Sequence, residues 1–392
     1  MSDFSALAGL LCALLALHSI ALYPLTLLLF ARRERTFAAI PPLPTGRPTL
    51  AICMCAYNEE KPIEAKMERL LEIAAAYGPA TIHVYADAPT DRTATLLEKY
   101  ADRADIVFGR ERRGKTFGMN LLVERSDSEL LLFTDANVES EADVAQQLVQ
   151  PLLADPEIGC TTARLVYSNR KETPTAKLGA AYWAVEEAIK RLESRSVGLI
   201  GCDGAMFIMR RSLHVTPPAH LIDDLYLSLS ILISGSRIVS VDHVEVYERS
   251  ATQASEEGRR KRRIACQAWN VHRALWPRLR RLPALSLYAY FSHRPMKWLM
   301  PFFVAASVCF FTLAIGLSRG AFAGLATAAG IALAYLIGSL LPLPPFSLFY
   351  SAVCSLAGVA IGTYESFILD RTYTIWNPAL SVRDQTPLAE DG

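Results

Sequence analysis

The stretch LAICMCAYNEE, residues 50–60, decides the fold class of this 392-residue chain. Its apolar part predicts a buried strand over residues 49–56, and the polar residues that follow predict where this strand ends. Residues 60–77 then have the spacing of an amphipathic helix. Because short apolar runs and amphipathic stretches alternate as far as residue 257, the sequence predicts an α/β domain with a mostly parallel sheet and helices on both faces.

The same alternation predicts the other elements of this domain. Strands are expected at residues 81–86, 130–134, 159–166, 205–209 and 237–241, and helices at 94–101, around 182–191 and around 224–234. In such a sheet the ligand binds at the carboxyl ends of the strands, so polar residues just after strands are the first candidates for a site.

Four groups of candidates stand at such positions or at the start of a later helix. A single acidic residue there is most often a helix cap or a turn residue. Four acidic clusters together favour an anionic substrate held with Mg²⁺ or Mn²⁺. The four groups are Tyr57 to Glu59, Asp87 with Asp91, Asp135 with Asn137, and Asp223 with Asp224.

The composition places part of the chain in a membrane. Hydrophobic residues make up 52% and charged residues 20%, and the mean hydropathy is +0.22, above the usual range of a fully soluble domain. The net charge of +1 argues against a nucleic-acid partner. None of the eight cysteines forms a C-x-x-C pair, which favours buried thiols in a reducing compartment.

Three uncharged stretches are candidates for membrane helices. Residues 4–30 are followed at once by Arg32, Arg33 and Arg35, which predicts an uncleaved N-terminal anchor with the next domain in the cytoplasm. Residues 298–318 form the second stretch. Residues 320–364 are too long for one crossing and are interrupted by prolines, so we divide them into two helices. Four crossings would leave the C-terminus outside, whereas a re-entrant last helix would leave it in the cytoplasm.

Six motifs carry a resemblance to a known family. The motifs are A-Y-N-E-E (56–60), A-D-A-P-T-D-R-T (86–93), R-R-G-K-T-F-G-M-N (112–120), F-T-D-A-N (133–137), G-C-D-G-A-M-F (201–207) and D-D-L (223–225). In this order, they resemble family 2 glycosyltransferases, and especially the membrane-embedded, processive members such as bacterial exopolysaccharide, poly-N-acetylglucosamine, chitin and hyaluronan synthases. The resemblance covers residues 50–263 and implies a GT-A fold.

With this resemblance the chain divides into five parts. The tail contains Trp376, Asn377, Pro378 and Arg383, which predict an ordered segment. The parts are an N-terminal transmembrane anchor (1–34), a GT-A glycosyltransferase domain (48–258), basic and aromatic interfacial helices (259–297), a transmembrane region (298–370) and the C-terminal tail (371–392).

The resemblance also implies a donor site. The usual D-G-S-T-D motif is changed here, because Ala88 and Pro89 replace Gly and Ser. Asp135 and Asn137 would hold Mg²⁺ or Mn²⁺, and Asn137 replaces the second aspartate of the D-x-D motif with a neutral oxygen ligand. The residues implied to bind the nucleotide sugar are Ala56, Tyr57, Glu59, Asp87, Lys115, Asp135 and Arg263.

For catalysis the resemblance implies one base. Asp224 matches the second position of the family's E-D motif and would take the proton of the acceptor hydroxyl. One base without a covalent nucleophile predicts inversion at the anomeric carbon. On the acceptor side the resemblance implies Cys202, Asp203, Gly204 and Asp223, although a role as helix cap or polar loop residue is the favoured interpretation of Asp223.

The largest departure lies after the domain. Polymerising members carry Q-x-x-R-W, and this chain has Arg260 in place of Gln and Ile264 in place of Trp. Arg263 retains the charge that a diphosphate requires, while the missing Trp puts long-chain processivity in doubt. Trp269, about one turn later, is a candidate substitute, although anchoring of a helix at the membrane interface explains this residue equally well.

The sequence therefore favours an inverting, metal-dependent glycosyltransferase in the bacterial inner (plasma) membrane. It would transfer a sugar from UDP-GlcNAc or UDP-glucose to a growing cell-surface polysaccharide, together with partner subunits of an export complex. A close alternative is transfer to a membrane lipid, as in ceramide glucosyltransferases. A third interpretation, a catalytically silent nucleotide-sugar-binding subunit, is supported only by Asn137.

Overall fold

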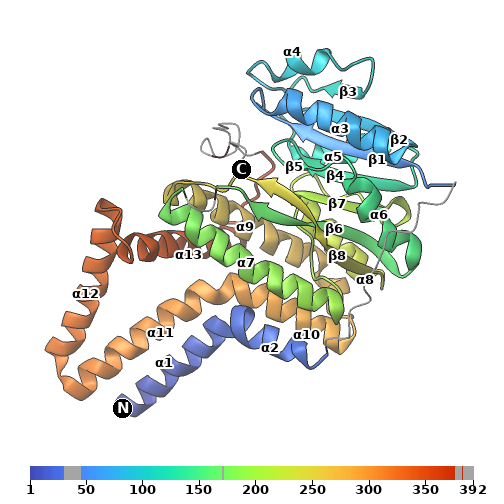
Figure 1. The fold of residues 1–392 in the computed structure, drawn as a ribbon. Helices are drawn as coiled ribbons and strands as arrows, with labels where there is room; N and C mark the ends of the chain where they lie inside the picture. The colour runs from blue at the N-terminus through green and yellow to red at the C-terminus, as the bar shows by residue number, and fades with distance from the viewer. Residues whose placement is uncertain (31–45, 170–171, 376–381, 383–392) are drawn as a thin grey trace.

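The structure is a computed structural model that describes residues 1–30, 46–169, 172–375 and 382 (Figure 1). An α/β domain with one curled sheet lies on one side, and a group of long helices extends from it on the other. Arg32, Arg33 and Arg35, and the predicted tail residues Trp376, Asn377, Pro378 and Arg383, lie outside the described residues.

The α/β domain contains one eight-stranded sheet in the order β3-β2-β1-β4-β7-β6-β8-β5. Strand pairs β1–β2, β1–β4, β2–β3 and β6–β8 are parallel, whereas β4–β7, β6–β7 and β5–β8 are antiparallel. The predicted mostly parallel sheet is therefore confirmed. The strands are β1 (Leu50–Ala56), β2 (Ala80–Ala86), β3 (Asp105–Phe108), β4 (Leu130–Asp135), β5 (Glu139–Ser140), β6 (Ile158–Tyr167), β7 (Met206–Arg210) and β8 (Arg237–Glu248).

Helices cover both faces of this sheet (Figure 1). The central strand β1 is almost entirely buried because α3 packs on one face and α5 on the other, so nearly all its residues are apolar. The helices of this domain and its lower edge are α3 (Ile63–Tyr77), α4 (Thr93–Glu98), α5 (Lys115–Glu124), α6 (Val144–Ala154), α7 (Pro174–Arg195), α8 (Asp223–Ile233), α9 (Ala254–Leu279) and α10 (Ala284–His293).

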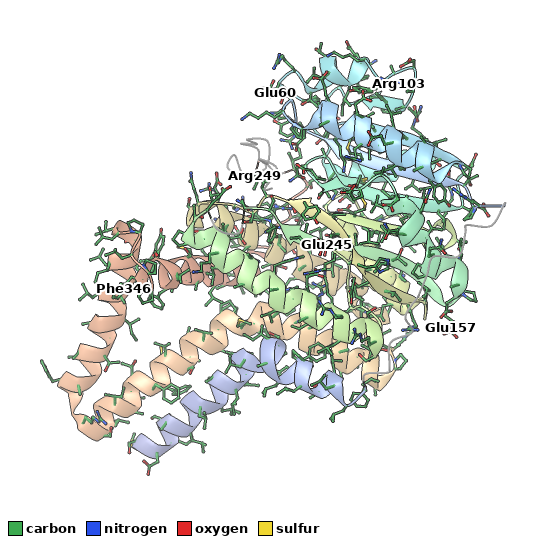
Figure 2. All side chains as sticks on the ribbon, viewed as in Figure 1. Glu60, Arg103, Glu157, Glu245, Arg249 and Phe346 are labelled. Atoms are coloured by element: carbon green, nitrogen blue, oxygen red, sulfur yellow. The ribbon has the colours of Figure 1, made fainter. Side chains whose placement is uncertain are left out.

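Within the described parts of the chain, four helices are long and apolar enough to cross a membrane: Ser2–Leu28, Pro295–Arg319, Ala321–Leu340 and Phe346–Phe367. The first consists of α1 (Ser2–Leu17), a π-helical turn (His18–Leu22) and α2 (Tyr23–Leu28); the others are α11, α12 and α13. On the outer sides of α1, α11 and α12, apolar side chains project where no other element covers them (Figure 2). These faces have the composition that lipid contact requires.

Helix α1 packs along α11, whereas α12 meets α11 near the turn that joins them and then diverges from it (Figure 1). Ser307 donates a hydrogen bond to the carbonyl oxygen of Gly9 at 2.9 Å, which joins α11 to α1. Gly316 and Gly324 allow α11 and α12 to approach closely, because a Cβ atom on Gly324 would lie 3.1 Å from the Cα atom of Gly316.

The last of these helices, α13, returns to the α/β domain and packs along α9 (Figure 1). It runs parallel to α9, and a Cβ atom on Gly358 would collide with the carbonyl oxygen of Gly258. One turn later, a Cβ atom on Gly362 would collide with the carbonyl oxygen of Arg262. Two small residues on α13 thus let the two helices touch through their backbones. The described chain after α13 consequently lies on the same side as the α/β domain.

A buried cluster of polar and ionisable side chains connects the membrane helices to the α/β domain. His293, which is fully buried, hydrogen-bonds Glu193 at 2.7 Å and Glu186 at 2.8 Å, both on α7. Tyr23 donates a hydrogen bond to Glu193 at 2.7 Å from α2. These bonds join α2, α7 and α10 at the boundary between the domain and the membrane helices.

Candidate functional site

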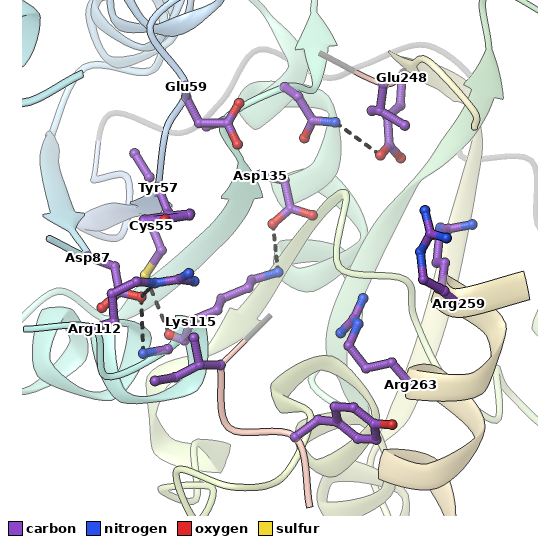
Figure 3. Close-up of a pocket in the computed structure, with 18 of the residues that line it drawn as sticks. Cys55, Tyr57, Glu59, Asp87, Arg112, Lys115, Asp135, Glu248, Arg259 and Arg263 are labelled. Atoms are coloured by element: carbon purple, nitrogen blue, oxygen red, sulfur yellow. Dashed lines mark hydrogen bonds and ion pairs between the residues drawn. The ribbon is translucent and has the colours of Figure 1, made fainter. Parts of the chain in front are cut away.

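One cavity of about 530 Å³ opens at the carboxyl edge of the sheet (Figure 3). Strands β1, β2 and β4 run parallel and end there, and the antiparallel strand β7 begins there. The polar residues that follow separate strands are therefore brought to one place. Eight residues predicted from the sequence line this cavity: Ala56, Tyr57, Glu59, Asp87, Lys115, Asp135, Asn137 and Arg263.

A cation–aromatic stack forms one end of the cavity. The guanidinium carbon of Arg112 lies 3.4 Å from the centre of the Tyr57 ring. Arg112 belongs to the R-R-G-K motif, and the sequence did not single it out. A flat aromatic ring beside a flat cation is a suitable surface for a nucleobase, whose faces stack on both kinds of group.

Asp87 holds the loop that precedes α5. Its carboxylate accepts hydrogen bonds from the backbone N–H groups of Arg113 at 2.7 Å and Gly114 at 3.1 Å. The next residue, Ala88, has a φ of 48°, in the left-handed region that favours the glycine of the usual motif. Asp87 therefore shapes the wall of the cavity.

Lys115 is the first residue of α5 and lies among three carboxylates. Its Nζ atom is 2.6 Å from Oδ1 of Asp135 and 3.8 Å from Oδ2 of Asp223. Burial alone would lower the pKa of Lys115, but the neighbouring carboxylates raise it above its usual value. Lys115 is therefore a fixed positive charge in the centre of the site.

Asp224 lies beside this cation at the start of α8. A Cβ atom on Gly204 would be 3.1 Å from Nζ of Lys115 and 3.2 Å from Oδ2 of Asp224, so the two groups meet across this glycine. Burial, followed by the negative charge of Asp223, raises the pKa of Asp224 to about 7. A carboxylate with such a pKa can accept a proton near neutral pH, as a general base must.

The residues present fit a divalent cation that is completed by a diphosphate. Asp135 presents a carboxylate to the cavity. Asn137 donates its amide N–H to Oε1 of Glu248 at 3.1 Å, which leaves the amide oxygen as the atom that can bind a metal. Among the described residues, no group of three or more His, Cys, Asp and Glu side chains could hold a metal ion. Mg²⁺ is commonly bound in this way, by one or two carboxylates together with substrate phosphates.

Two residues that the sequence analysis did not identify support the loop that carries Asp135 and Asn137. Glu248 ends β8 at the same edge of the sheet, and burial raises its pKa to about 6. Lys66, buried under the loop, donates hydrogen bonds to Thr134 at 3.0 Å and to the carbonyl oxygen of Val138 at 2.6 Å. Glu248 comes from a distant strand, and Lys66 occupies an ordinary helical position, so no local pattern identifies either residue.

The basic run on α9 is divided among three surroundings. Arg259, Arg260 and Arg263 line the cavity, while Arg262 turns away and hydrogen-bonds Glu365 of α13 at 2.8 Å. The ammonium group of Lys261 lies 4.5 Å from the ring centre of Tyr182 on α7. This segment was expected to lie at a lipid headgroup level, but three of its arginines face the site.

The chain after α13 supplies the opposite wall. Tyr373 and Ile375 line the cavity, and a Cβ atom on Gly114 would collide with the carbonyl oxygen of Thr374. No sequence motif predicts that residues so far from the first strand reach the site. They do so because α13 returns along α9.

The predicted acceptor-side residues lie in different surroundings in the structure. Gly204 adjoins Lys115 and Asp224, as described above. Asp203 is turned towards α7, where its Oδ2 atom accepts a hydrogen bond from Lys190 at 2.5 Å. Cys202 is buried, and its thiol and backbone N–H both lie within hydrogen-bonding distance of Ser228. The Cys202 side chain therefore belongs to the domain interior.

Trp269 does not provide the aromatic surface that the sequence analysis offered as a substitute. Its side chain is buried, and its indole N–H donates to Thr363 of α13 at 3.1 Å. The ring packs against Trp298 and Phe367. Trp269 lies six residues after Arg263 on α9, and its side chain faces α13. It therefore stabilises the contact between the domain and the membrane helices.

Comparison with known protein families and structures agrees with this fold. Residues 51–215 match the profile of the family described as glycosyl transferase family 2. The match includes Tyr57, Asp87, Lys115 and Asp135. The matched part of the chain is thus similar to family 2 glycosyltransferase domains. The domain has a GT-A fold, and the chain is a glycosyltransferase.

Among solved structures, the mannosyltransferase PcManGT from Pyrobaculum calidifontis, in complex with GDP-Man and Mn²⁺, has a TM-score of 0.69 at 19% identity. The alignment covers 93% of this chain and 99% of that one, so the two share a fold that includes the helices outside the α/β domain. Staphylococcus aureus TarS (residues 1–349) gives a TM-score of 0.45 at 14% identity and covers 82% of this chain and 92% of that one. A search of curated protein sequences finds no match.

Proposed function

We propose that this glycosyltransferase moves a sugar from a nucleoside-diphosphate sugar to a hydroxyl of a membrane-lipid acceptor, in one displacement that inverts the anomeric carbon. The observation that carries the chemistry is that Lys115, which lines the cavity together with Asp135, also adjoins Asp224 across Gly204. A base, a fixed cation and a carboxylate for a metal ion are the groups that such a displacement requires.

In the proposed reaction the acceptor O–H gives its proton to Asp224 while its oxygen forms a bond to the anomeric carbon. The bond from that carbon to the diphosphate breaks, and the electron pair leaves with the nucleoside diphosphate. Lys115 and Arg263 offset the negative charge that develops on the leaving group. A Mg²⁺ or Mn²⁺ ion held by Asp135 and Asn137 would add further positive charge against the diphosphate.

The donor end is proposed to lie between Tyr57 and Asp87. The stack of Arg112 on Tyr57 supports a nucleobase site, and the arginines of α9 lie across the cavity where the phosphates would follow. UDP-glucose and UDP-GlcNAc remain the first donors to test. GDP-mannose joins them because PcManGT, which shares the fold, was solved with GDP-Man.

The fold supports a lipid acceptor more than a growing polysaccharide. Of the four candidate membrane helices among the described residues, α13 returns to the domain and packs along α9. The remaining helices, α1 packed along α11 and the diverging α12, do not enclose a channel for a polar chain, whereas a lipid can approach them from the side. Ile264 at the position of the family's Trp, together with the buried Trp269, supports the same choice.

A donor and acceptor screen tests the proposal. The detergent-purified protein is given UDP-glucose, UDP-GlcNAc or GDP-mannose with Mg²⁺ or Mn²⁺, with and without a membrane lipid extract, and the products are analysed by mass spectrometry. We expect one donor to give a lipid that carries a single added sugar, and Asp224→Asn to give none. An elongating glycan without lipid would instead support the polysaccharide synthase. Donor binding without turnover under every condition would support the silent subunit.

A further inference from the structure

A carboxylate at the end of α13 gathers contacts from two other segments. Glu365 is 1% exposed, and Arg262 of α9 donates a hydrogen bond to its Oε2 atom at 2.8 Å. From the chain that follows α13, Arg371 donates to Oε1 at 2.7 Å. Tyr373 donates its hydroxyl to Oε2 at 2.8 Å. Glu365 therefore ties residues 371–373 to α9.

Side chains on α9 hold the backbone of the same segment. Asn270 donates an amide N–H to the carbonyl oxygen of Arg371 at 2.8 Å. Gln267 does the same to the carbonyl oxygen of Tyr373 at 2.8 Å. The path of residues 371–373 is thus fixed at two carbonyl groups in addition to the contacts of Glu365.

Gln267 also reaches the donor cavity. Its Oε1 atom accepts a hydrogen bond from Nη1 of Arg263 at 3.1 Å. A guanidinium can only donate and a carbonyl can only accept, so the two bonds fix which end of the Gln267 amide faces each partner. A shift of Tyr373 would therefore turn Gln267 and remove an acceptor from Arg263.

The segment and Arg263 meet at the same cavity. Tyr373 and Arg263 both line it, and the Thr374 carbonyl group touches Gly114 at the start of α5. The chain after α13 therefore closes the space between α5 and α9, on the side from which a diphosphate would meet Arg263 (Figure 3).

We propose that Glu365 is a positioning residue for the donor site: it anchors the segment 371–375, which sets the side chain of Arg263 through Gln267. This inference rests on the proposed function, because it assumes that the cavity takes a nucleoside diphosphate. It adds a link from α13, a helix outside the α/β domain, to the group that meets the second phosphate.

Nucleotide affinities of four variants test this link. Glu365→Gln weakens the bonds from Arg262 and Arg371, Tyr373→Phe removes only the hydroxyl tether, and Gln267→Leu cuts the connection to Arg263. Tyr364→Phe is the matched control, because it removes the same hydroxyl from a neighbouring residue of α13 whose side chain is exposed. Calorimetry measures the binding of UDP, UMP, GDP and GMP to the full chain in detergent, and thermal unfolding checks folding.

We expect the first three variants to bind the nucleoside diphosphate about fivefold more weakly, as the loss of one net hydrogen bond implies. Affinity for the corresponding monophosphate is expected to stay unchanged, because it lacks the second phosphate. Glu365→Gln combined with Tyr373→Phe should lose little more than Glu365→Gln alone, since both act on one tether.

Other outcomes separate the two proposals. If the wild-type protein binds neither diphosphate, the proposed function fails. If it binds one and the variants keep the wild-type ratio of diphosphate to monophosphate affinity, Glu365 does not position Arg263. An equal loss of both nucleotides would mean that the segment only maintains the shape of the cavity, which also overturns the inference.

Discussion

The ammonium group of Lys115 lies 2.6 Å from the carboxylate of Asp135, which we propose as a ligand of the metal ion. A lysine at this distance offsets the charge of Asp135 before any metal or diphosphate is bound. Metal binding must therefore compete with an ion pair that the protein already makes. This contact leads to the first prediction.

Lys115→Met should raise the affinity of the nucleotide-free protein for Mn²⁺, because Asp135 loses its cationic partner. The same change should weaken binding of the nucleoside diphosphate, because a positive charge is lost from its site. Electron paramagnetic resonance of free Mn²⁺ measures the first effect and calorimetry the second. Unchanged Mn²⁺ affinity would place the metal away from Asp135; Lys99→Met, on the exposed surface of the domain, is the control.

Asp224 should give transfer a characteristic pH dependence. Its pKa of about 7 means that the base is protonated in acid, so the rate should fall about tenfold per pH unit below 7 and level off above it. Asp224→Asn should abolish transfer and leave nucleotide binding nearly intact. Full activity in this variant would remove Asp224 as the base.

The same raised pKa predicts a stability effect of the opposite sign. A buried carboxyl group whose folded pKa lies above its unfolded value stabilises the protein at low pH, and this stabilisation is lost as the pH rises through about 7. Asp224→Asn should therefore raise the free energy of unfolding by roughly 1–3 kcal/mol at pH 8 and have little effect at pH 4. Thermal unfolding at both pH values checks this, with the exposed Asp127→Asn as control.

Asn137→Asp should increase the affinity for Mn²⁺ but reduce stability in the absence of metal. The new carboxylate would lie beside Glu248, which now accepts a hydrogen bond from Asn137 at 3.1 Å. Replacing Glu248 by Gln in the same protein should restore stability, because a like-charge contact is removed. If Asn137→Asp leaves both metal affinity and stability unchanged, Asn137 does not belong to the metal site.

The contact between α9 and α13 should be sensitive to one methyl group. Gly358→Ala would force the two helices apart, because its Cβ atom would collide with the carbonyl oxygen of Gly258. We expect destabilisation of about 1–3 kcal/mol together with weaker donor binding, since α9 carries the arginines of the cavity. Gly330→Ala on α12 is the matched control, because no atom lies within 4 Å of its Cβ position. Equal unfolding temperatures for the two variants would contradict the close packing.

Much of the donor site could be predicted because it lies at the ends of strands with strong local patterns. The buried strand β1 and the acidic residues after β2 and β4 occur where the sequence analysis placed them. The strand β3 was missed because it has only four residues at the edge of the sheet. Helix α5 was missed because its short, mixed sequence follows a turn in which Gly114 has a φ of 87°.

The remaining parts of the site depend on long-range packing. Glu248 comes to Asn137 through the pairing of β5 with β8, and Tyr373 reaches Arg263 only because α13 returns along α9. Neither relationship leaves a pattern in nearby residues. Trp269 illustrates the converse: its type and spacing suited a sugar-binding role, yet its helical position directs it towards α13.

The five basic residues from Arg259 to Arg263 face three surroundings because an α-helix turns by about 100° per residue. Their order therefore carries information that their summed charge does not. Deleting one residue just before this run would keep every positive charge and yet rotate each side chain towards its neighbour's surroundings. The phase of α9, rather than its basicity, determines which guanidinium meets the cavity and which meets Glu365.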